Sequence, residues 1–255
     1  MNSINLQKKE FRLIMKKIKR SSELLWLFGI IFVALGVSIC SKANLGVSMI
    51  AAPAFVISEA ISTLIQGFSV GVTEYVIQGI MLIALCLIVG RFNWRYLLAF
   101  AVAVIYGYTL DFFLWILSGI QFDAVWLRWV MLLVGDVITA FGVACFFRTY
   151  MPLQVYELFV AELSDRFKIN IARVKTFFDL SLLIISILLS IVLFLDVKDF
   201  DWSTIYYSSF HSIGLGTLVT TAINSPIIAI MGKLIDRLFD KSPRFEGLYK
   251  ILRRN

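Results

Sequence analysis

The 255-residue chain has few of the residues that metal sites, disulfide frameworks and catalytic centres need. It contains a single histidine, His211, and three cysteines that all lie in apolar stretches. The cysteine spacing matches neither a zinc site nor a disulfide framework. The sequence also lacks a glycine-rich phosphate loop and a serine–histidine pair. We therefore expect no metal, no cofactor and no enzymatic activity.

Charged residues are scarce as well, at 16% of the chain, whereas 60% of it is hydrophobic. Two uncharged runs, 24–41 and 202–232, are 18 and 31 residues long. A helix needs about 20 residues to cross the hydrocarbon core of a bilayer. The first apolar run begins at Leu24 and continues as a full span, unlike a signal peptide. The sequence predicts an all-α polytopic membrane protein, with the lipid bilayer as its main partner.

Six stretches are apolar and long enough to be transmembrane helices: 23–41, 69–90, 96–117, 126–147, 174–195 and 213–235. The segment 47–66 is nearly as long, but serines, a proline and Glu59 interrupt it. A second segment, 153–167, contains Glu157 and Arg166 among other charges and cannot cross lipid alone. We expect both of these segments to be short helices that do not span.

The basic residues decide the orientation of the six spans. With both ends in the cytoplasm, 21 of the 24 lysines and arginines lie on the cytoplasmic side. This asymmetry explains the net charge of +7 without a nucleic-acid partner. We predict a basic cytoplasmic N-terminal segment 1–22, which either serves only to anchor the topology or lies as a helix on the anionic inner leaflet of a bacterial inner membrane. A membrane domain 23–235 and a basic cytoplasmic tail 236–255 follow.

An internal duplication organises the chain. The stretch 34–59 recurs in degraded form at 140–165, with a constant offset of 106. After a five-residue deletion, the match resumes at offset 101. Each copy contains three spans, and an odd number reverses the second copy in the membrane. The sequence therefore predicts two inverted repeats, about 23–117 and 126–235, each with a short non-spanning helix after its first span.

Each repeat has a break between its first span and its short helix. The breaks contain Gly46-Val47-Ser48 and Pro152-Leu153-Gln154, and each one is expected to begin a new helix. Lys42 and Arg148, which are equivalent at offset 106, precede the breaks. A cation beside a helix N-terminus can hold an anion. The alternative is that both side chains extend to the two headgroup layers.

Polar side chains at membrane depth are costly and usually face a cavity or a partner. Glu74 and Lys175 are equivalent at offset 101, and so are Gln78 and Asp179. We expect a buried Glu74–Lys175 ion pair, in a cavity shared with Lys42 and Arg148. The alternative pairs Lys175 with Asp179 and leaves Glu74 to bind a proton or a substrate.

The sixth span contains Asn224-Ser225-Pro226, which is expected to break the helix. The freed carbonyl of Ala222 could then bind a cation, or the proline could simply produce a kink. The candidate substrate-binding residues are therefore Lys42, Gly46, Ser48, Glu74, Gln78, Arg148, Gln154, Lys175, Asp179 and Asn224.

Several short motifs resemble the YczE/YyaS/YitT family of bacterial integral membrane proteins over about residues 25–235. The motifs are Lys42-Ala43-Asn44-Leu45-Gly46-Val47-Ser48, Ser69-Val70-Gly71-Val72-Thr73, Gly107 with Asp111, Val174-Lys175-Thr176-Phe177-Phe178-Asp179 and Ile213-Gly214-Leu215-Gly216-Thr217. The resemblance implies a membrane location and names no substrate. Ser225-Pro226 stands where that family usually has Gly-Pro.

These features lead to two hypotheses. The first is a transporter or permease for a small molecule or ion, such as an anion, because inverted repeats, broken helices and intramembrane carboxylates are typical of such proteins. The second is a non-transporting accessory or regulatory protein that binds a partner through its basic cytoplasmic face. A solvated cavity between the halves favours the first, and a dry, fully packed bundle favours the second.

Overall fold

The computed structural model describes residues 22–62, 65, 68–194, 212–239 and 243–252. These residues form helices and loops and contain no strand. Six helices are long and apolar enough to cross a membrane: α2 (Ser22–Ala43), α4 (Val70–Val89), α5 (Arg95–Ile116), α6 (Val125–Phe146), α8 (Ile171–Phe194) and α9 (Leu215–Leu238). The prediction of six long apolar helices is therefore confirmed. The predictions for segment 1–21, for the loop around 195–211 and for His211 lie outside the described residues.

Two short helices follow α2 and α6, as predicted. They are α3 (Ala52–Ser62) and α7 (Val155–Phe167), with 11 and 13 residues. At 1.5 Å per residue they rise about 17 and 20 Å, well short of the roughly 30 Å hydrocarbon core. Neither helix is long enough to span.

The start of α3 differs from the prediction. Asn44 and Gly46 have positive φ angles of 52° and 108°, which end the α2 helix and keep the chain non-helical. A turn then begins at Ser48, whose carbonyl accepts hydrogen bonds from the N–H groups of Ala51 and Ala52. The helix start predicted at Gly46-Val47-Ser48 is therefore wrong. The start of α7 is close to the prediction, with Gln154 at its N-cap.

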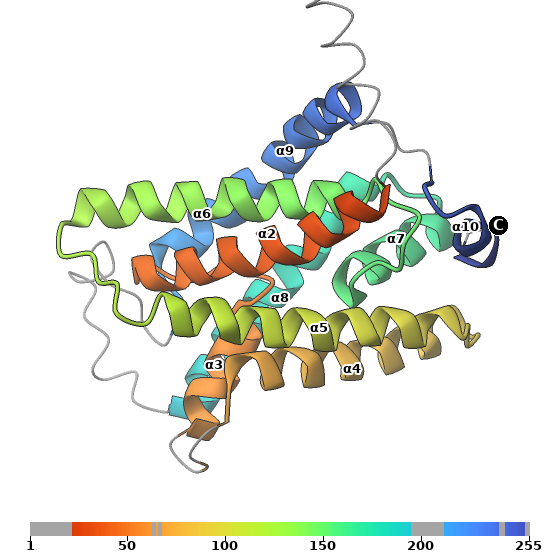
Figure 1. Ribbon diagram of the computed structural model, residues 1–255. Coiled ribbons are helices and arrows are strands. Elements are labelled where there is room, and N and C mark those ends of the chain that lie inside the picture. Colours follow the sequence, from red (N-terminus) through yellow and green to blue (C-terminus); the bar gives the residue numbers. More distant parts are fainter. Residues whose placement is uncertain (1–21, 63–64, 66–67, 195–211, 240–242, 253–255) are drawn as a thin grey trace, which may run out of the picture.

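The helix ends gather at two ends of the bundle (Figure 1). At one end, Ser22 at the start of α2 bonds Thr149, which follows α6, and Arg148 pairs with Asp236 of α9. We call this the basic end, because it also carries Arg91, Arg95, Arg166 and Lys168. The C-terminal helix α10 (Glu246–Leu252) lies there too. The opposite end holds the end of α2 and the start of α9.

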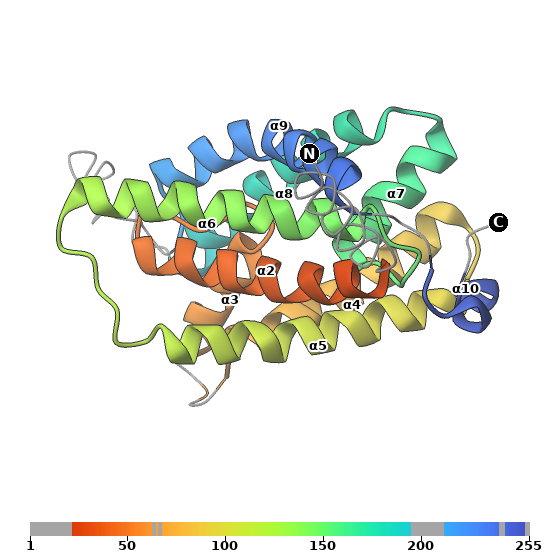
Figure 2. The same ribbon diagram turned by 45° about the horizontal axis from the view of Figure 1, so that its top comes forward.

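Helices α2 and α6 run side by side through the centre (Figures 1 and 2). Glycines allow the two backbones to approach. A Cβ added at Gly36 would lie 2.5 Å from the carbonyl oxygen of Gly135, and one at Gly142 would lie 3.0 Å from that of Gly29. Gly36 and Gly142 are related by the offset of 106, and so are Gly29 and Gly135. The contact is therefore reciprocal, as in an interface around a two-fold axis.

The remaining helices pack in matching pairs on either side of this crossing. Helix α2 also packs against α5, while α6 packs against α9. The short helix α3 packs against α8, and α7 packs against α4. Each short helix thus contacts a spanning helix from the other half of the sequence. Apolar clusters lie at these contacts: Ile50, just before α3, shares one with Phe178 of α8, and Leu158 of α7 shares another with Leu85 of α4.

The predicted break in the sixth span is not found. Helix α9 runs without interruption from Leu215 to Leu238, with Pro226 inside it. The loss of one N–H donor at a proline can be tolerated in a membrane helix when neighbouring groups compensate.

Candidate functional site

A small enclosed cavity lies at the centre of the molecule, between the two short helices. Its volume is about 10 Å³, which is close to the smallest space that holds one water molecule. Ser48 and Gln154, from the two breaks, both line it and are each 1% exposed. These two sequence-predicted residues are therefore brought together.

Most of the cavity wall consists of residues in equivalent positions. Ten of its eleven lining residues fall into five pairs related by the offset of 106. The pairs are Val33 with Thr139, Val37 with Val143, Ser48 with Gln154, Ile50 with Tyr156, and Ala51 with Glu157. Tyr106 of α5 is the eleventh lining residue. Glu157 and Tyr156 were not among the predicted site residues, although they follow Gln154 by only three and two positions in the chain.

Glu74 and Gln78 lie on α4 beside this cavity, and both are fully buried. The Tyr156 hydroxyl donates to Glu74 Oε2 at 2.9 Å, and Gln78 Nε2 donates to the same oxygen at 3.4 Å. Glu74 Oε1 has no hydrogen-bond partner in the described part of the chain. Tyr156 thus connects Glu74 to the cavity wall.

Lys175 and Asp179 form the equivalent pair on α8. Lys175 Nζ lies 2.6 Å from Asp179 Oδ1, and both side chains are buried. The predicted ion pair between Lys175 and Glu74 is therefore wrong. A partner four residues away on the same helix is always within reach, so the local pair forms instead.

Asn224 of α9 is fully buried and donates from Nδ2 to Asp136 Oδ1 at 2.8 Å. Asp136 belongs to α6 and is itself 0% exposed. This contact explains why Asn224 is tolerated inside the membrane domain: its amide solvates a buried carboxyl group.

Lys42, Arg148 and Gly46 do not reach the central cavity. Arg148 forms two hydrogen bonds with Asp236, at 3.0 and 3.1 Å. Lys42, half-buried at the end of α2, lines a surface pocket at the opposite end together with Asp123. The predicted cavity shared by all four charged residues is therefore wrong, and the two cations lie near the two ends of the bundle. Gly46 instead touches the start of α9.

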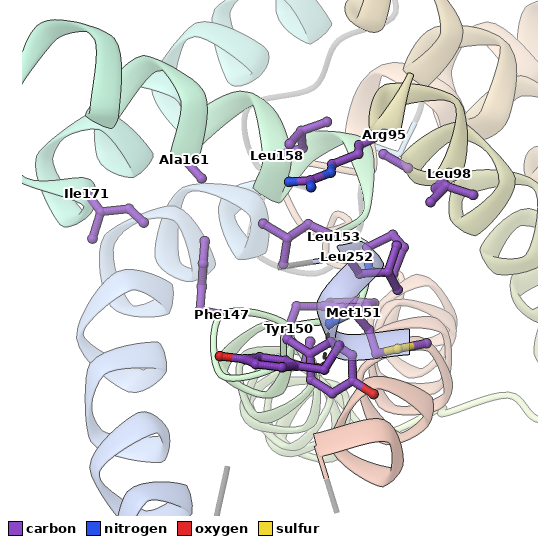
Figure 3. A pocket seen from close by; sticks show the side chains of 15 residues that line it. Arg95, Leu98, Phe147, Tyr150, Met151, Leu153, Leu158, Ala161, Ile171 and Leu252 are labelled. Carbon is purple, nitrogen blue, oxygen red and sulfur yellow. Dashed lines mark hydrogen bonds between the residues drawn. The ribbon is translucent and has the colours of Figure 1, made fainter. Parts of the chain in front are cut away.

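A larger cavity of about 420 Å³ opens at the basic end, and we call it the vestibule (Figure 3). Arg95 and Leu98 of α5 line it on one side, and Tyr150, Pro152 and Leu153 of the second break line it on the other. In the chain, Leu153 of the vestibule wall directly precedes Gln154 of the central cavity wall. The two cavities are thus lined by consecutive residues of the second break.

The C-terminal helix α10 borders the vestibule and is anchored to α2. Glu23 Oε1 accepts hydrogen bonds from the N–H groups of Arg244 and Phe245. The Tyr150 hydroxyl donates to the same oxygen, and its ring packs edge-on against Tyr249 of α10. Burial and the bond to Glu23 raise the pKa of Tyr150 above its ordinary value, so the hydroxyl keeps the proton that it donates.

The fold and this buried polar centre define an integral membrane protein with six candidate spans. The chain belongs to a family of unknown function, DUF6198, whose model matches residues 18–233. No curated protein and no solved structure matches the chain.

Proposed function

We propose that the protein is a transporter of small solutes, built from two inverted repeats whose pseudo-two-fold axis passes through the central cavity. The observation that carries the proposal is the cavity wall, to which five pairs of equivalent residues contribute both of their members. A residue close to such an axis meets its own equivalent, so this wall is what an inverted repeat would produce. Transporters of this architecture place their binding sites at the interface between the repeats.

Two further features support a transport cycle. In this proposal the opposite end is the closed one, because the first break is joined to the start of α9 there: the N–H of Val47 bonds the carbonyl of Ser212, and the N–H of Gly216 bonds that of Leu45. The basic end contains the vestibule, and Leu153 in its wall directly precedes Gln154 in the wall of the central cavity. One open and one closed end is the arrangement that alternating access requires. In this proposal the closed centre widens when the halves move, and the solute then contacts Gln154 and Ser48.

The proposal places the protein in a bacterial inner membrane with the basic end in the cytoplasm. Cysteine labelling in a cysteine-less background tests this orientation. Gln121→Cys should react with an impermeant reagent outside intact cells, and Asn93→Cys only after permeabilisation. External labelling at position 93 would reject the orientation.

We infer no catalytic reaction for the protein. We also propose that its relation to YczE/YyaS/YitT proteins is a distant one.

An untargeted metabolite comparison tests the transport function. Cells with the protein should differ from cells without it in the level of at least one small solute. Gln154→Ala, which removes a polar group from the central cavity, should abolish the difference. Ser62→Ala is the matched control, because its hydroxyl is exposed at the end of α3 and bonds only locally. If no solute distinguishes the cells, transport is rejected.

The second candidate is a non-transporting accessory protein, and the small volume of the central cavity favours it. Its binding surface would be a pocket of about 820 Å³ at the basic end, lined by Arg91, Arg95, Asp165 and Arg166. In this case Arg166→Glu, at an exposed position, should abolish the metabolite difference, whereas Gln154→Ala should preserve it. The two variants therefore separate the candidates.

A further inference from the structure

Three oxygen atoms that line the central cavity lack hydrogen-bond partners. They are Ser48 Oγ, Gln154 Oε1 and Glu157 Oε2, none of which is paired within the described residues. Each of the three residues is at most 2% exposed. Native proteins pair nearly all buried polar groups, and an unpaired one often indicates an ion or water that supplies the missing contact.

The charges around the cavity favour a positive ligand. Glu157 in the wall and Glu74 beside it repel each other when both are ionised, and Lys175, the nearby cation that attracts Glu157, is itself bonded to Asp179. The starts of α3 and α7 contribute roughly half a positive charge each, which is less than the two carboxylates carry. A buried carboxylate without a counter-charge is strongly unfavourable. When both carboxyl groups are ionised, a bound cation would supply the positive charge that the two helix starts leave missing.

The volume of the cavity and its three unpaired oxygen atoms further restrict which ligand can bind. A cavity of about 10 Å³ holds one particle the size of a water molecule. All three unpaired atoms are oxygens, the ligand type that hard metal cations prefer. We propose that Ser48, Gln154 and Glu157 bind one alkali cation, such as Na⁺. Its role as the coupling ion rests on the proposed transport function, because repeat interfaces are where coupling ions bind.

Thermal unfolding of the full-length protein in detergent tests this site. The melting temperature is measured in NaCl, in KCl and in N-methyl-D-glucamine chloride, at equal ionic strength and fixed pH. Stabilisation by a bound ligand grows with its concentration relative to the Kd. We expect the melting temperature to rise with Na⁺ or K⁺ and to saturate, with no such rise in N-methyl-D-glucamine.

Variants assign the effect to the cavity. Glu157→Gln should remove the dependence on the cation, and Glu157→Asp should keep it with weaker binding. Glu162→Gln is the matched control, because Glu162 lies on the same helix but lines the pocket at the basic end. Ser48→Ala should raise the cation concentration for half-maximal stabilisation by about tenfold, as expected for losing one bond to a charged group.

Equal melting temperatures in all three salts, or a dependence on pH alone, would overturn the proposal and leave a proton or a water in the cavity. Cation stabilisation that persists in Glu157→Gln would also overturn the proposal. The experiment measures binding without transport. If cations stabilise the protein but its presence changes no solute level, the cation site is kept and the transport function is rejected. If a solute level changes but no cation stabilises the protein, the transport function is kept and the cation site is rejected.

Discussion

The two breaks occupy equivalent positions but are packed differently. The first break is buried from Leu45 to Ala51 and is joined to the start of α9 by two backbone hydrogen bonds. The second is half-buried from Thr149 to Leu153 and borders the vestibule beside α5. It is held instead by α2, where Trp26 Nε1 donates to the carbonyl of Pro152 at 2.8 Å. Equivalent positions in the sequence therefore do not determine how a break is packed, since the neighbouring helix differs between the two.

The largest difference between the halves is expected at Glu74 and Lys175. Lys175→Met should lower the free energy of unfolding by about 3–5 kcal/mol, because it leaves Asp179 buried without its partner. Glu74→Gln should cost only about 1–2 kcal/mol, because Tyr156 and Gln78 can still bond the amide. Denaturant unfolding in detergent measures both.

The double variant sharpens this comparison. Since Glu74 and Lys175 are not bonded to each other, the two losses should add. Lys175→Met combined with Asp179→Asn should instead recover much of the single loss. If Glu74→Gln instead restored stability to Lys175→Met, a direct ion pair between Glu74 and Lys175 would be indicated, in contradiction to the structure.

The next largest difference in stability loss is expected between substitutions at Gly46 and at Pro152, which are equivalent at offset 106. Gly46→Ala should cost about 3 kcal/mol, because φ is 108° and the new Cβ would lie 2.3 Å from Thr217 Oγ1. Pro152→Ala should cost less than about 1 kcal/mol, because the second break is open on one side. Thermal melting compares them, and Gly119→Ala, which has open space around it, is the control. Equal losses at 46 and 152 would remove the proposed asymmetry.

The halves should behave alike where α2 crosses α6. Gly36→Ala and Gly142→Ala should each cost about 2 kcal/mol, because each added methyl group would collide with backbone of the other helix. Gly79→Ala on α4, which faces only the Phe100 ring, should cost less. A large loss at one of the two crossing glycines alone would contradict a two-fold crossing.

The smallest effect is expected at the anchor of the second break. Trp26→Phe removes the hydrogen bond to Pro152 and should cost about 1 kcal/mol. It should also speed the labelling of a cysteine at position 153 in the vestibule, because the break is held less tightly. An unchanged labelling rate would show that Trp26 does not restrain the break.

The sequence was sufficient to predict the six spans, because length and apolarity are local properties. It also indicated Ser48 and Gln154, one from each break, as candidate binding residues, and both line the central cavity. The start of α3 could not be predicted, because the bonds of Val47 and Leu45 join residues more than 160 positions away. The sequence does contain one signal that was missed. Gly29 and Gly135 share the same offset as Gly36 and Gly142, and the four glycines define the central crossing.

The charged residues were harder to place. Glu157 served in the sequence analysis only to show that its segment cannot span, yet its side chain is 2% exposed and lines the cavity. Burial of this kind depends on how α7 packs against α4 and α8, which no local pattern reveals. For Arg148, the deciding contact is Asp236, 88 residues away.

Paired cysteine labelling of the two breaks tests the central claim, which is that the two ends open alternately. Val47→Cys reports on the closed end and Leu153→Cys on the vestibule. Each is combined with Gly216→Ala, whose Cβ would lie 2.7 Å from the Leu45 carbonyl oxygen and should push the start of α9 away from the first break. We expect Gly216→Ala to speed external labelling at position 47 and to slow internal labelling at position 153. A rise at position 47 with no fall at position 153 would contradict alternating access.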